Sequence, residues 1–446
     1  MKIEQFEDKG LAHYSYAILS ECESKIVLID PARDIAPYLS YAEKNEATII
    51  GVIETHPHAD FVSGHLELHQ TTRAIIYCSK LLGAEYPHQT FDDGEVLEFG
   101  KIKLKALNTP GHSPDSICIV LEHKGVDKAV FTGDTLFIGD CGRPDLREQA
   151  GNITSKREEL ARQMYYSLRE KLLVLANEVS VYPAHGAGTL CGKALSDASR
   201  STIGAERVSN WSLQEMSEVQ FIQALLEDQP FMPKYFEYDV AVNKRGAAAL
   251  QGSLANVPIG KPAKINGQLF IVDTRPEQDF KKGHLPGSIN IQSDGKFETW
   301  LGSIIGPEEA FYLVAASDEM LKQLVSKAAK IGYEIFIEAA FVIEAGSEQT
   351  EPLDLGNFMS ASTQYTVVDI RNASEVQAQP VFTEAINIPL PELRERILEI
   401  PFNKPIVVHC AGGYRSAAGS SIIGNALRFK TKVYDLGESI RQFILA

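Results

Sequence analysis

The chain has 446 residues, of which 44% are hydrophobic and 23% are charged, and its formal net charge is −16. This length predicts two or three domains, and the composition is that of a folded globular protein. The acidic charge argues against nucleic-acid and anionic-membrane partners, because phosphate groups are bound by basic surfaces.

Hydropathy and cysteine usage narrow the class of protein further. No uninterrupted apolar run approaches the ~20 residues of a transmembrane helix, and the acidic N-terminus lacks the apolar stretch of a secretory signal. The six cysteines are scattered and form no CxxC pair. This spacing predicts free thiols in a reducing cytoplasm rather than a disulfide scaffold or a zinc finger.

Short apolar strands alternate with helical spacing through the first half of the chain. The predicted strands are 26–30, 48–54, 74–78 and a strand-rich stretch over 96–131, and the predicted helices are 34–45, 61–72 and 156–175. Alternation of this kind predicts a mixed α/β layered domain.

The second half contains an approximate internal repeat with a period of about one hundred residues. The segment 270–275 (FIVDTR) is echoed by 367–371 (VVDIR), and 286–291 is echoed by 384–389. Irregular segments rich in Gly, Ala and Pro or in acidic residues precede each copy. We therefore predict an N-terminal domain over residues 1–250 and two copies of a small α/β domain over 258–345 and 355–446.

Four segments that end apolar strands in the first half carry potential metal ligands. Their residues are His56, His58 and Asp60 in the first segment, then His112, Asp134 and His185. A lone Asp or His at a strand exit is usually a turn or capping residue. Four such segments in order instead predict ligands that converge on one cation, since strand ends hold side chains rigidly.

This ordered set resembles the metallo-β-lactamase superfamily, whose motif is HxHxDH followed by a His, an Asp and a final His. The resemblance covers roughly the first 235 residues and implies an αββα sandwich. The hydrolytic members place a histidine directly after the motif Asp, where this chain has Phe61. Phenylalanine cannot bind a metal, so the sequence favours the single-metal branch, the persulfide dioxygenases, over the two-metal hydrolases.

Within that branch the resemblance implies one Fe(II) per chain, held by His56, His112 and Asp134. Two imidazoles and one carboxylate are the facial triad of non-haem iron oxygenases. By the same resemblance, the three remaining motif residues line the cavity and orient ligands or water without binding iron. These residues are His58, Asp60 and His185.

The sequence does not identify the small thiol that carries the persulfide sulfur. The segment after His185 is typical of the rhodanese fusions rather than of glutathione-using relatives, so coenzyme A, bacillithiol and glutathione persulfides are all candidates. Arg143 is a candidate ligand for a substrate carboxylate or phosphate. A structural ion pair with Asp145 or another acidic residue is the equal alternative.

The C-terminal copy delivers a cysteine from a β-branched strand into a Gly-rich loop, which resembles the active loop of rhodanese sulfurtransferases. Cys410 is the predicted nucleophile, Arg415 and the loop amides are predicted to hold an anionic persulfide, and Ser416 is the expected N-cap of a helix over 417–428. The persulfide loop comprises Ala411, Gly412, Gly413, Tyr414 and Ser416.

The earlier copy keeps the rhodanese scaffold residues but has neither a cysteine nor a Gly-rich loop at its equivalent strand exit, 312–318. We expect it to be catalytically inactive and to serve in spacing, docking or oligomerisation. The resemblance thus implies a metallo-β-lactamase αββα domain followed by two rhodanese-like α/β domains with parallel sheets, in a chain that forms homo-oligomers.

The predicted activity is oxidation of a small-thiol persulfide by O2 to sulfite and free thiol, coupled to transfer of sulfane sulfur through Cys410 to give thiosulfate. A zinc thioester hydrolase of the glyoxalase II type and a non-oxidative sulfur carrier are the alternatives.

His65 and His69, one helical turn apart, are expected to be solvent-facing or capping residues, because their spacing is not HExxH. Cys141 and Cys191 are expected to be packing residues, with a sulfur relay as the alternative.

Overall fold

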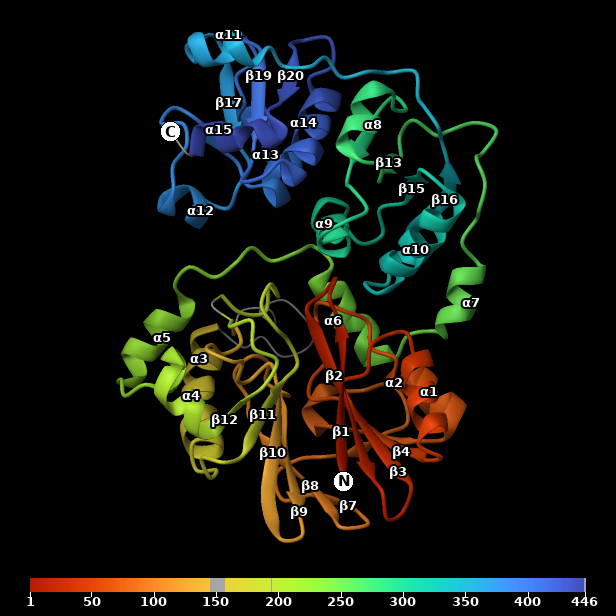
Figure 1. Ribbon diagram of the computed structural model, residues 1–446, viewed down its shortest axis with the longest axis vertical. Helices are drawn as coiled ribbons and strands as arrows, with labels where there is room; N and C mark the ends of the chain where they lie inside the picture. Colours follow the sequence, from red (N-terminus) through yellow and green to blue (C-terminus); the bar gives the residue numbers. More distant parts are fainter. Residues whose placement is uncertain (145–156, 194, 445–446) are drawn as a thin grey trace. The chain divides into compact units, whose positions relative to one another are not determined.

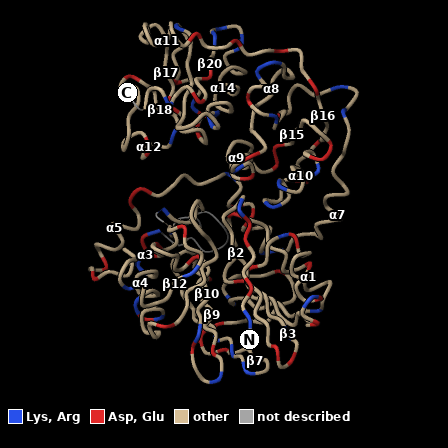
Figure 2. Tube along the Cα trace, viewed as in Figure 1, with Lys and Arg blue, Asp and Glu red and all other residues tan. Residues whose placement is uncertain are grey.

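The computed structural model describes residues 1–144, 157–193 and 195–444, and the chain divides into two compact units (Figure 1). Unit 1 comprises residues 1–253 together with 329–332, and unit 2 comprises 254–328 and 333–446. No helix among the described residues has the length and apolarity needed to cross a membrane. Basic and acidic residues are interspersed along the trace of the described residues (Figure 2).

Unit 1 contains two mixed sheets. The first has the order β1 (Lys2–Asp8), β2 (His13–Ser20), β3 (Lys25–Ile29), β4 (Thr48–Ile53), β5 (Ile75–Cys78) and β6 (Gln89–Thr90). The second has the order β12 (Ser201–Thr202), β11 (Ser180–Pro183), β10 (Val126–Gly133), β9 (Ile117–His123), β8 (Ile102–Asn108) and β7 (Val96–Phe99). The helices are α1 (Ala36–Lys44), α2 (His65–Thr72), α3 (Arg157–Tyr166), which runs on into a π-helical turn (Ser167–Leu172), α4 (Ile203–Ser209), α5 (Glu218–Leu226) and α6 (Phe236–Arg245), with α7 (Leu250–Ala255) at the junction with unit 2.

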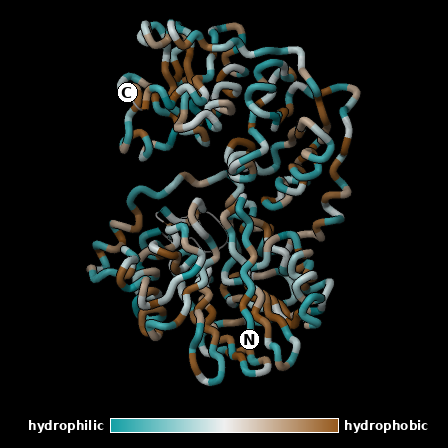
Figure 3. The backbone as a smooth tube through the Cα atoms, in the orientation of Figure 1, coloured by the Kyte–Doolittle hydropathy of each residue, from teal (hydrophilic) through white to brown (hydrophobic). Residues whose placement is uncertain are grey.

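Three separate cores define the layers of this unit. Side chains of both sheets, such as Ile18 and Leu104, form the middle core. A second core lies between α1, α2 and the first sheet, and a third between α3, α5 and the second sheet. Figure 1 shows these helices on the outer sides of the sheets, and Figure 3 shows the apolar segments gathered in the strands. The αββα sandwich that the resemblance implied is therefore present.

Each rhodanese-type copy in unit 2 is a four-stranded parallel sheet. The first has the order β14 (Ser288–Asn290), β13 (Phe270–Asp273), β15 (Phe311–Ala315) and β16 (Ile337–Val342), with helices α8 (Glu277–Lys282), α9 (Phe297–Ile304) and α10 (Asp318–Ala329). The second has the order β18 (Ile386–Asn387), β17 (Thr366–Asp369), β19 (Ile406–His409) and β20 (Val433–Asp435), with helices α11 (Leu355–Ser360), α12 (Ala373–Ala378), α13 (Leu393–Arg396), α14 (Tyr414–Ala426) and α15 (Arg441–Ile444).

The predicted internal repeat is confirmed by matching polar contacts in the two copies. Arg275 forms a buried ion pair with Asp273 at 2.7 Å, and Arg371 forms the equivalent pair with Asp369 at 2.6 Å. In each copy an asparagine on the next strand of the chain, Asn290 or Asn387, donates to the backbone carbonyls of both residues of this pair. The DxR motif is therefore a scaffold element that closes the exit of the first strand.

Two predicted helices differ in extent from the observed ones. The helix predicted over 61–72 begins only at His65, because residues 61–64 form a buried turn in which Ser63 donates to Glu54 at 2.8 Å. The helix predicted over 156–175 is α3 with its π-helical extension to Leu172, and its first predicted residue lies outside the described ranges.

Candidate metal centre and cysteine loop

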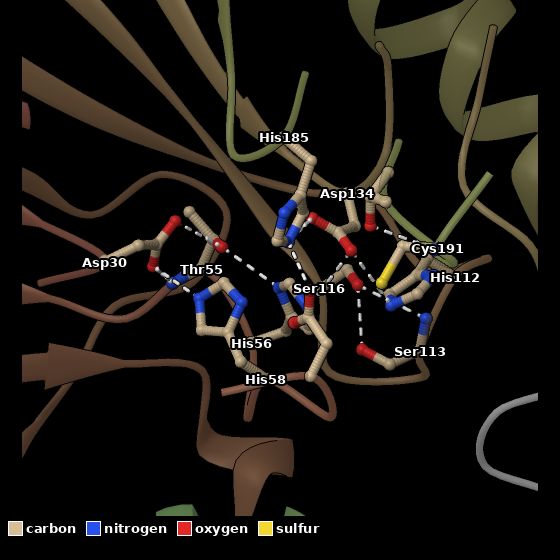
Figure 4. Close-up of polar contacts among 12 residues, drawn as sticks. Asp30, Thr55, His56, His58, His112, Ser113, Ser116, Asp134, His185 and Cys191 are labelled. Atoms are coloured by element: carbon tan, nitrogen blue, oxygen red, sulfur yellow. Dashed lines mark hydrogen bonds and ion pairs between the residues drawn. The ribbon is translucent and has the colours of Figure 1, made fainter. Parts of the chain in front are cut away.

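Three predicted ligands converge at the end of the sandwich where β4, β10 and the β8–β9 loop meet. The Nε2 atoms of His56 and His112 lie 3.8 and 3.4 Å from the same carboxylate oxygen of Asp134. All three side chains are buried, and Figure 4 shows the rings turned toward the carboxylate. One potential ligand atom from each residue lies within 4.8 Å of the others, a spacing that one metal ion can bridge.

In each of the two histidines, a hydrogen bond at Nδ1, the ring nitrogen that faces away from Asp134, fixes the orientation of the imidazole. His112 Nδ1 contacts the carbonyl oxygen of Arg143 at 2.8 Å, and His56 Nδ1 contacts the hydroxyl of Thr55 at 3.0 Å. Asp30 in turn accepts hydrogen bonds from the backbone and the hydroxyl of Thr55. Contacts of this kind orient metal-binding histidines and leave Nε2 for the ion.

Two glycines allow the backbone to approach this centre. Gly133, directly before Asp134, has φ +49°, and a Cβ atom there would lie 2.5 Å from Thr55 Oγ1. At Gly142 a Cβ atom would collide with the backbone carbonyl of Asp134 and lie 3.0 Å from His112 Nδ1. Only glycine fits either position without moving a predicted ligand.

The donor set fits a divalent transition metal. The distances of 3.4 to 3.8 Å between Asp134 and its histidines exceed normal hydrogen-bond lengths, which places the carboxylate beside the rings without bonding them directly. Burial lowers the pKa of His112 although Asp134 opposes the shift, so this imidazole is neutral and able to act as a ligand. Imidazole and carboxylate ligands suit iron and zinc alike.

The three other motif residues lie next to this centre. His58 Nε2 is 3.2 Å from Asp30, and His185 Nε2 is 3.4 Å from Asp60 and 3.5 Å from Asp134. Burial disfavours a charge on His58, but Asp30 outweighs it and raises the pKa of His58 to about 9. His58 is therefore held by Asp30, whereas Asp60 and His185 border the carboxylate of Asp134.

Phe61 occupies the place where two-metal relatives carry a histidine. Its ring is buried, 3.8 Å from the ring of His13 and 4.3 Å from that of His58 between centroids. Sequence reasoning missed His13, because it lies in β2 without any motif around it. Burial and the nearby His185 and His58 lower the pKa of His13 well below its ordinary value, so its ring is a neutral wall of the site.

Cys191 is a second residue whose position the sequence did not predict. Its sulfur forms a potential ligand group with Asp134 and His185, within 4.8 Å of each. Burial and the carboxylates of Asp60 and Asp134 raise the pKa of this thiol well above its ordinary value. The only signal in the sequence was its short distance from His185 along the chain. Cys141, by contrast, is buried in the core between the second sheet and α3, as expected.

The structure leaves both interpretations of Arg143 as predictions, whereas it corrects the one for His65. Arg143 is buried and donates to the backbone carbonyls of Leu190 and Phe231, so its observed contacts join segments of the chain. Asp145, its alternative partner, lies outside the described residues. The solvent-facing or capping role expected of His65 is wrong: the ring is fully buried, 3.7 Å from Glu54, and burial lowers its pKa to about 3.

The cysteine loop of the second copy lies between β19 and α14. Cys410 is buried, and the backbone N–H of Gly413 donates to its sulfur at 3.1 Å. The expected N-cap role of Ser416 is wrong, because the helix already begins at Tyr414 with Gly413 as its N-cap; Ser416 donates instead to the Gly413 carbonyl at 2.9 Å. The helix N-terminus and the loop amide therefore lie next to the sulfur, which favours an anion there.

Arg415 makes two hydrogen bonds of 2.6 and 2.7 Å with the carboxylate of Glu375. Burial raises the pKa of Glu375, but Arg415 outweighs this effect and keeps it below its ordinary value. The arginine charge is thus paired with a carboxylate. In the first copy α10 begins at Asp318, three residues after β15 ends at Ala315, with no loop comparable to the one at Cys410.

Comparisons with known proteins agree with this architecture. The family model "Metallo-beta-lactamase superfamily" matches residues 9–185, and "Rhodanese-like domain" matches 261–349 and 354–446. A metallo-beta-lactamase structure from Staphylococcus aureus is 31% identical with a TM-score of 0.69, covering 76% of this chain and 98% of that one. The chain therefore belongs to the metallo-β-lactamase superfamily and continues into two rhodanese-like domains.

Curated relatives of the N-terminal part include persulfide dioxygenases and hydroxyacylglutathione hydrolases. Persulfide dioxygenase ETHE1 of Bos taurus is 29% identical over 54% of this chain and 85% of its own length. A probable hydroxyacylglutathione hydrolase of Schizosaccharomyces pombe is 32% identical over 39% of this chain, which spans 63% of that protein. The chain is similar to both groups, and the site residues stay predictions that these likenesses do not test.

Proposed function

We propose that this chain oxidises the terminal sulfur of a small-thiol persulfide with O2 at an iron centre held by His56, His112 and Asp134. The reaction is RSSH + O2 + H2O → RSH + sulfite + 2H⁺. Bound Fe(II) would supply adjacent open positions for the persulfide sulfur and O2, together with the electrons that activate O2. The observation that carries the proposal is the buried triad beside Phe61. Phe61 stands where the two-metal motif has a histidine ligand, so a second metal ion lacks that ligand.

The residues around the triad have separable tasks. Thr55 and the Arg143 carbonyl keep the two imidazoles in the tautomer that exposes Nε2. Asp60 and His185, which contact each other at 3.4 Å, can hold and move the protons that the reaction releases. Phe61, His13 and the buried surroundings exclude bulk water, which protects a reactive persulfide from side reactions.

We propose that Cys410 then transfers sulfane sulfur to sulfite. The Cys410 thiolate attacks a second persulfide, forms a Cys410 persulfide and releases RSH. Sulfite attacks the outer sulfur of that persulfide, which yields thiosulfate and restores the thiolate. The Gly413 amide and the N-terminus of α14 stabilise the anionic sulfur in both steps. All six cysteines are free thiols, which supports cytoplasmic work on sulfane sulfur.

Oxygen uptake by anaerobically iron-loaded protein tests the first step. A panel of coenzyme A, bacillithiol and glutathione persulfides identifies the carrier, and a thioester serves as the control substrate. We expect uptake with at least one persulfide and its loss in Asp134→Ala. The matched control is Asp127→Ala at the start of the same strand, where the carboxylate pairs with Lys105 on the surface. Uptake that survives in Asp134→Ala overturns the proposal.

A zinc thioester hydrolase is the second candidate, because hydroxyacylglutathione hydrolases are among the relatives. Thioester hydrolysis by zinc-loaded protein, with no oxygen uptake by iron-loaded protein, would select it. A non-oxidative sulfur carrier would show neither activity while still transferring sulfur through Cys410.

Replacement of Cys410 tests the second step. Cys410→Ser should still consume O2 but release sulfite in place of thiosulfate, because the metal centre remains while the sulfur acceptor is lost. Ion chromatography of both products gives the result, and Cys22→Ser, at an exposed cysteine, is the control. Unchanged thiosulfate output would show that Cys410 does not couple the two reactions.

A further inference from the structure

The cysteine-free rhodanese copy contacts the catalytic copy at the cysteine loop itself. Tyr414, the first residue of α14, donates its hydroxyl to the backbone carbonyl of Gln292 in the inactive copy at 2.8 Å. The ring of Tyr414 also packs beside Gly295, where a Cβ atom would lie 3.7 Å from it. The inactive copy therefore holds the residue that directly follows Gly413, the donor to the Cys410 sulfur.

A second contact between the copies involves the turn after β20. Lys281, on α8 of the inactive copy, pairs with Asp435 of the catalytic copy at 2.8 Å and with Glu277 of its own helix at 2.6 Å. The other oxygen of Asp435 accepts the backbone N–H of Gly437 at 2.9 Å. One carboxylate thus connects the inactive copy to the turn after β20.

That turn lies against the cysteine loop, backbone to backbone. A Cβ atom at Gly413 would lie 3.1 Å from the carbonyl carbon of Gly437 and 3.0 Å from the backbone nitrogen of Glu438. Gly413 has φ +104° and Gly437 has φ +55°, so both positions favour glycine. A shift of Gly437 must therefore displace Gly413, whose N–H is the donor to Cys410.

Both copies also line one cavity of about 550 Å³ at this place, with Gln292 and Lys281 from the inactive copy and Gly412 and Gly413 from the catalytic copy. The cavity adjoins the exposed side of the loop, so a sulfur donor that approaches here meets both copies. The contact between the copies accordingly borders Gly412, Gly413 and Tyr414 of the cysteine loop.

We propose that the inactive rhodanese copy is a positioning element of the sulfurtransferase site, in which Lys281 and Gln292 hold the backbone of the cysteine loop in the shape that stabilises an anionic sulfur on Cys410. Lys281 acts through Asp435 and Gly437, and Gln292 acts through Tyr414. Neither is a catalytic residue. The proposal rests on the proposed sulfur transfer at Cys410 and assigns a task to the copy that has no cysteine.

The test compares Lys281→Met with Arg394→Met in the full chain. Arg394 is the matched control because it also joins the two copies, through two hydrogen bonds of 2.8 Å to Glu309, but none of its contacts involves the loop. Two readouts are measured: sulfur transfer from thiosulfate to cyanide, and the rate of Cys410 alkylation by iodoacetamide, followed by mass spectrometry with the exposed Cys22 as internal reference.

We expect Lys281→Met to lower kcat and the Cys410 alkylation rate by about threefold to tenfold, with a smaller change in KM, because a loosened loop stabilises the thiolate less well. Lys281→Arg should restore both, and Arg394→Met should resemble the wild-type chain in both. Tyr414→Phe, which removes only a hydroxyl, should move the same readouts and serves if Lys281→Met does not fold.

Equal effects of Lys281→Met and Arg394→Met, seen as lower melting temperatures without slower alkylation of Cys410, would overturn the proposal in favour of simple docking. Alkylation does not depend on turnover. A chain in which Cys410 transfers no sulfur would therefore disprove the sulfurtransferase function, while the alkylation rates of the variants would still decide whether the inactive copy positions the loop.

Discussion

Phe61 stands directly after Asp60, at the position where the two-metal motif has a histidine. Its buried ring packs against those of His13 and His58 and brings no metal ligand to the site. Phe61→His should raise the zinc bound per chain from one ion to two, because Asp60 and His185 already stand beside Asp134. Metal analysis of dialysed protein gives the stoichiometry.

The control for this substitution is Phe91→His, at a buried phenylalanine that packs on Tyr77 in the middle core. It should leave the metal content unchanged. A zinc content that stays at one ion in Phe61→His would show that something other than the missing imidazole prevents a second metal from binding.

His65 makes stability depend on pH. Burial lowers its pKa to about 3 in the folded chain from 6.5 in the unfolded one, so the unfolded state takes up the proton first. The contribution is complete above pH 6.5 and is lost as the pH falls toward 3, by at most about 1.4 kcal/mol per pH unit. His65→Leu should therefore reduce the drop in melting temperature between pH 7.5 and 5.5, whereas His69→Gln on the same helix should not.

The six side chains named from the sequence lie together at the candidate metal centre, and their roles there stay predictions. The places of His13 and Cys191 beside them were not predicted. The six follow strand ends in a fixed order, which a motif captures. Tertiary packing brings His13 from β2 and Cys191 from the segment after His185 to the same place. The spacing of residues along the chain does not indicate contacts of this kind. Burial of His65 was missed for the same reason, since its partner Glu54 belongs to another segment.

At the scale of elements, the strand-to-turn exit at Gly133 positions both Asp134 and Thr55. Gly133→Ala combines a left-handed φ of +49° with a Cβ atom 2.5 Å from Thr55 Oγ1. We expect a loss of about 2 to 4 kcal/mol in unfolding free energy together with weaker iron binding, because Thr55 orients His56. Denaturant unfolding and iron titration measure the two effects.

Gly125→Ala provides the matched control at the other end of the same strand. Its φ is +79°, but a Cβ atom there meets nothing within 4 Å. It should lose only about 1 kcal/mol, the strain of a left-handed alanine, and bind iron normally. If the two variants bind iron equally well, the contact with Thr55 does not set the geometry of the centre.

Element types were easier to predict than their ends. The periodic spacing of hydrophobic residues predicted where the strands and helices lie, because this spacing indicates which face of an element is buried. α2 starts later than predicted, after the turn in which Ser63 donates to Glu54, and α14 starts earlier than predicted, directly after the Gly413 amide that donates to the Cys410 sulfur. Helix propensity contains neither of these hydrogen bonds.

At the scale of the whole molecule, the repeat and the domain order could be predicted from the sequence, because each copy carries its own DxR ion pair and its own parallel sheet. The contacts between the inactive copy and the cysteine loop could not be predicted from the sequence. They join Lys281 to Asp435 and Gln292 to Tyr414, pairs more than one hundred residues apart that neither copy specifies alone.

Joining the two proposed activities in one chain has a consequence that dilution can measure. Sulfite released by a chain that also carries Cys410 meets that cysteine at an effective concentration that does not fall when the protein is diluted. A mixture of Asp134→Ala and Cys410→Ser chains retains each site once, but on different molecules. We expect thiosulfate formed per O2 consumed to stay constant for the wild-type chain on dilution and to fall for the mixture, with sulfite accumulating instead. Equal yields at every dilution would mean that sulfite diffuses freely between chains and that the fusion gives no kinetic coupling.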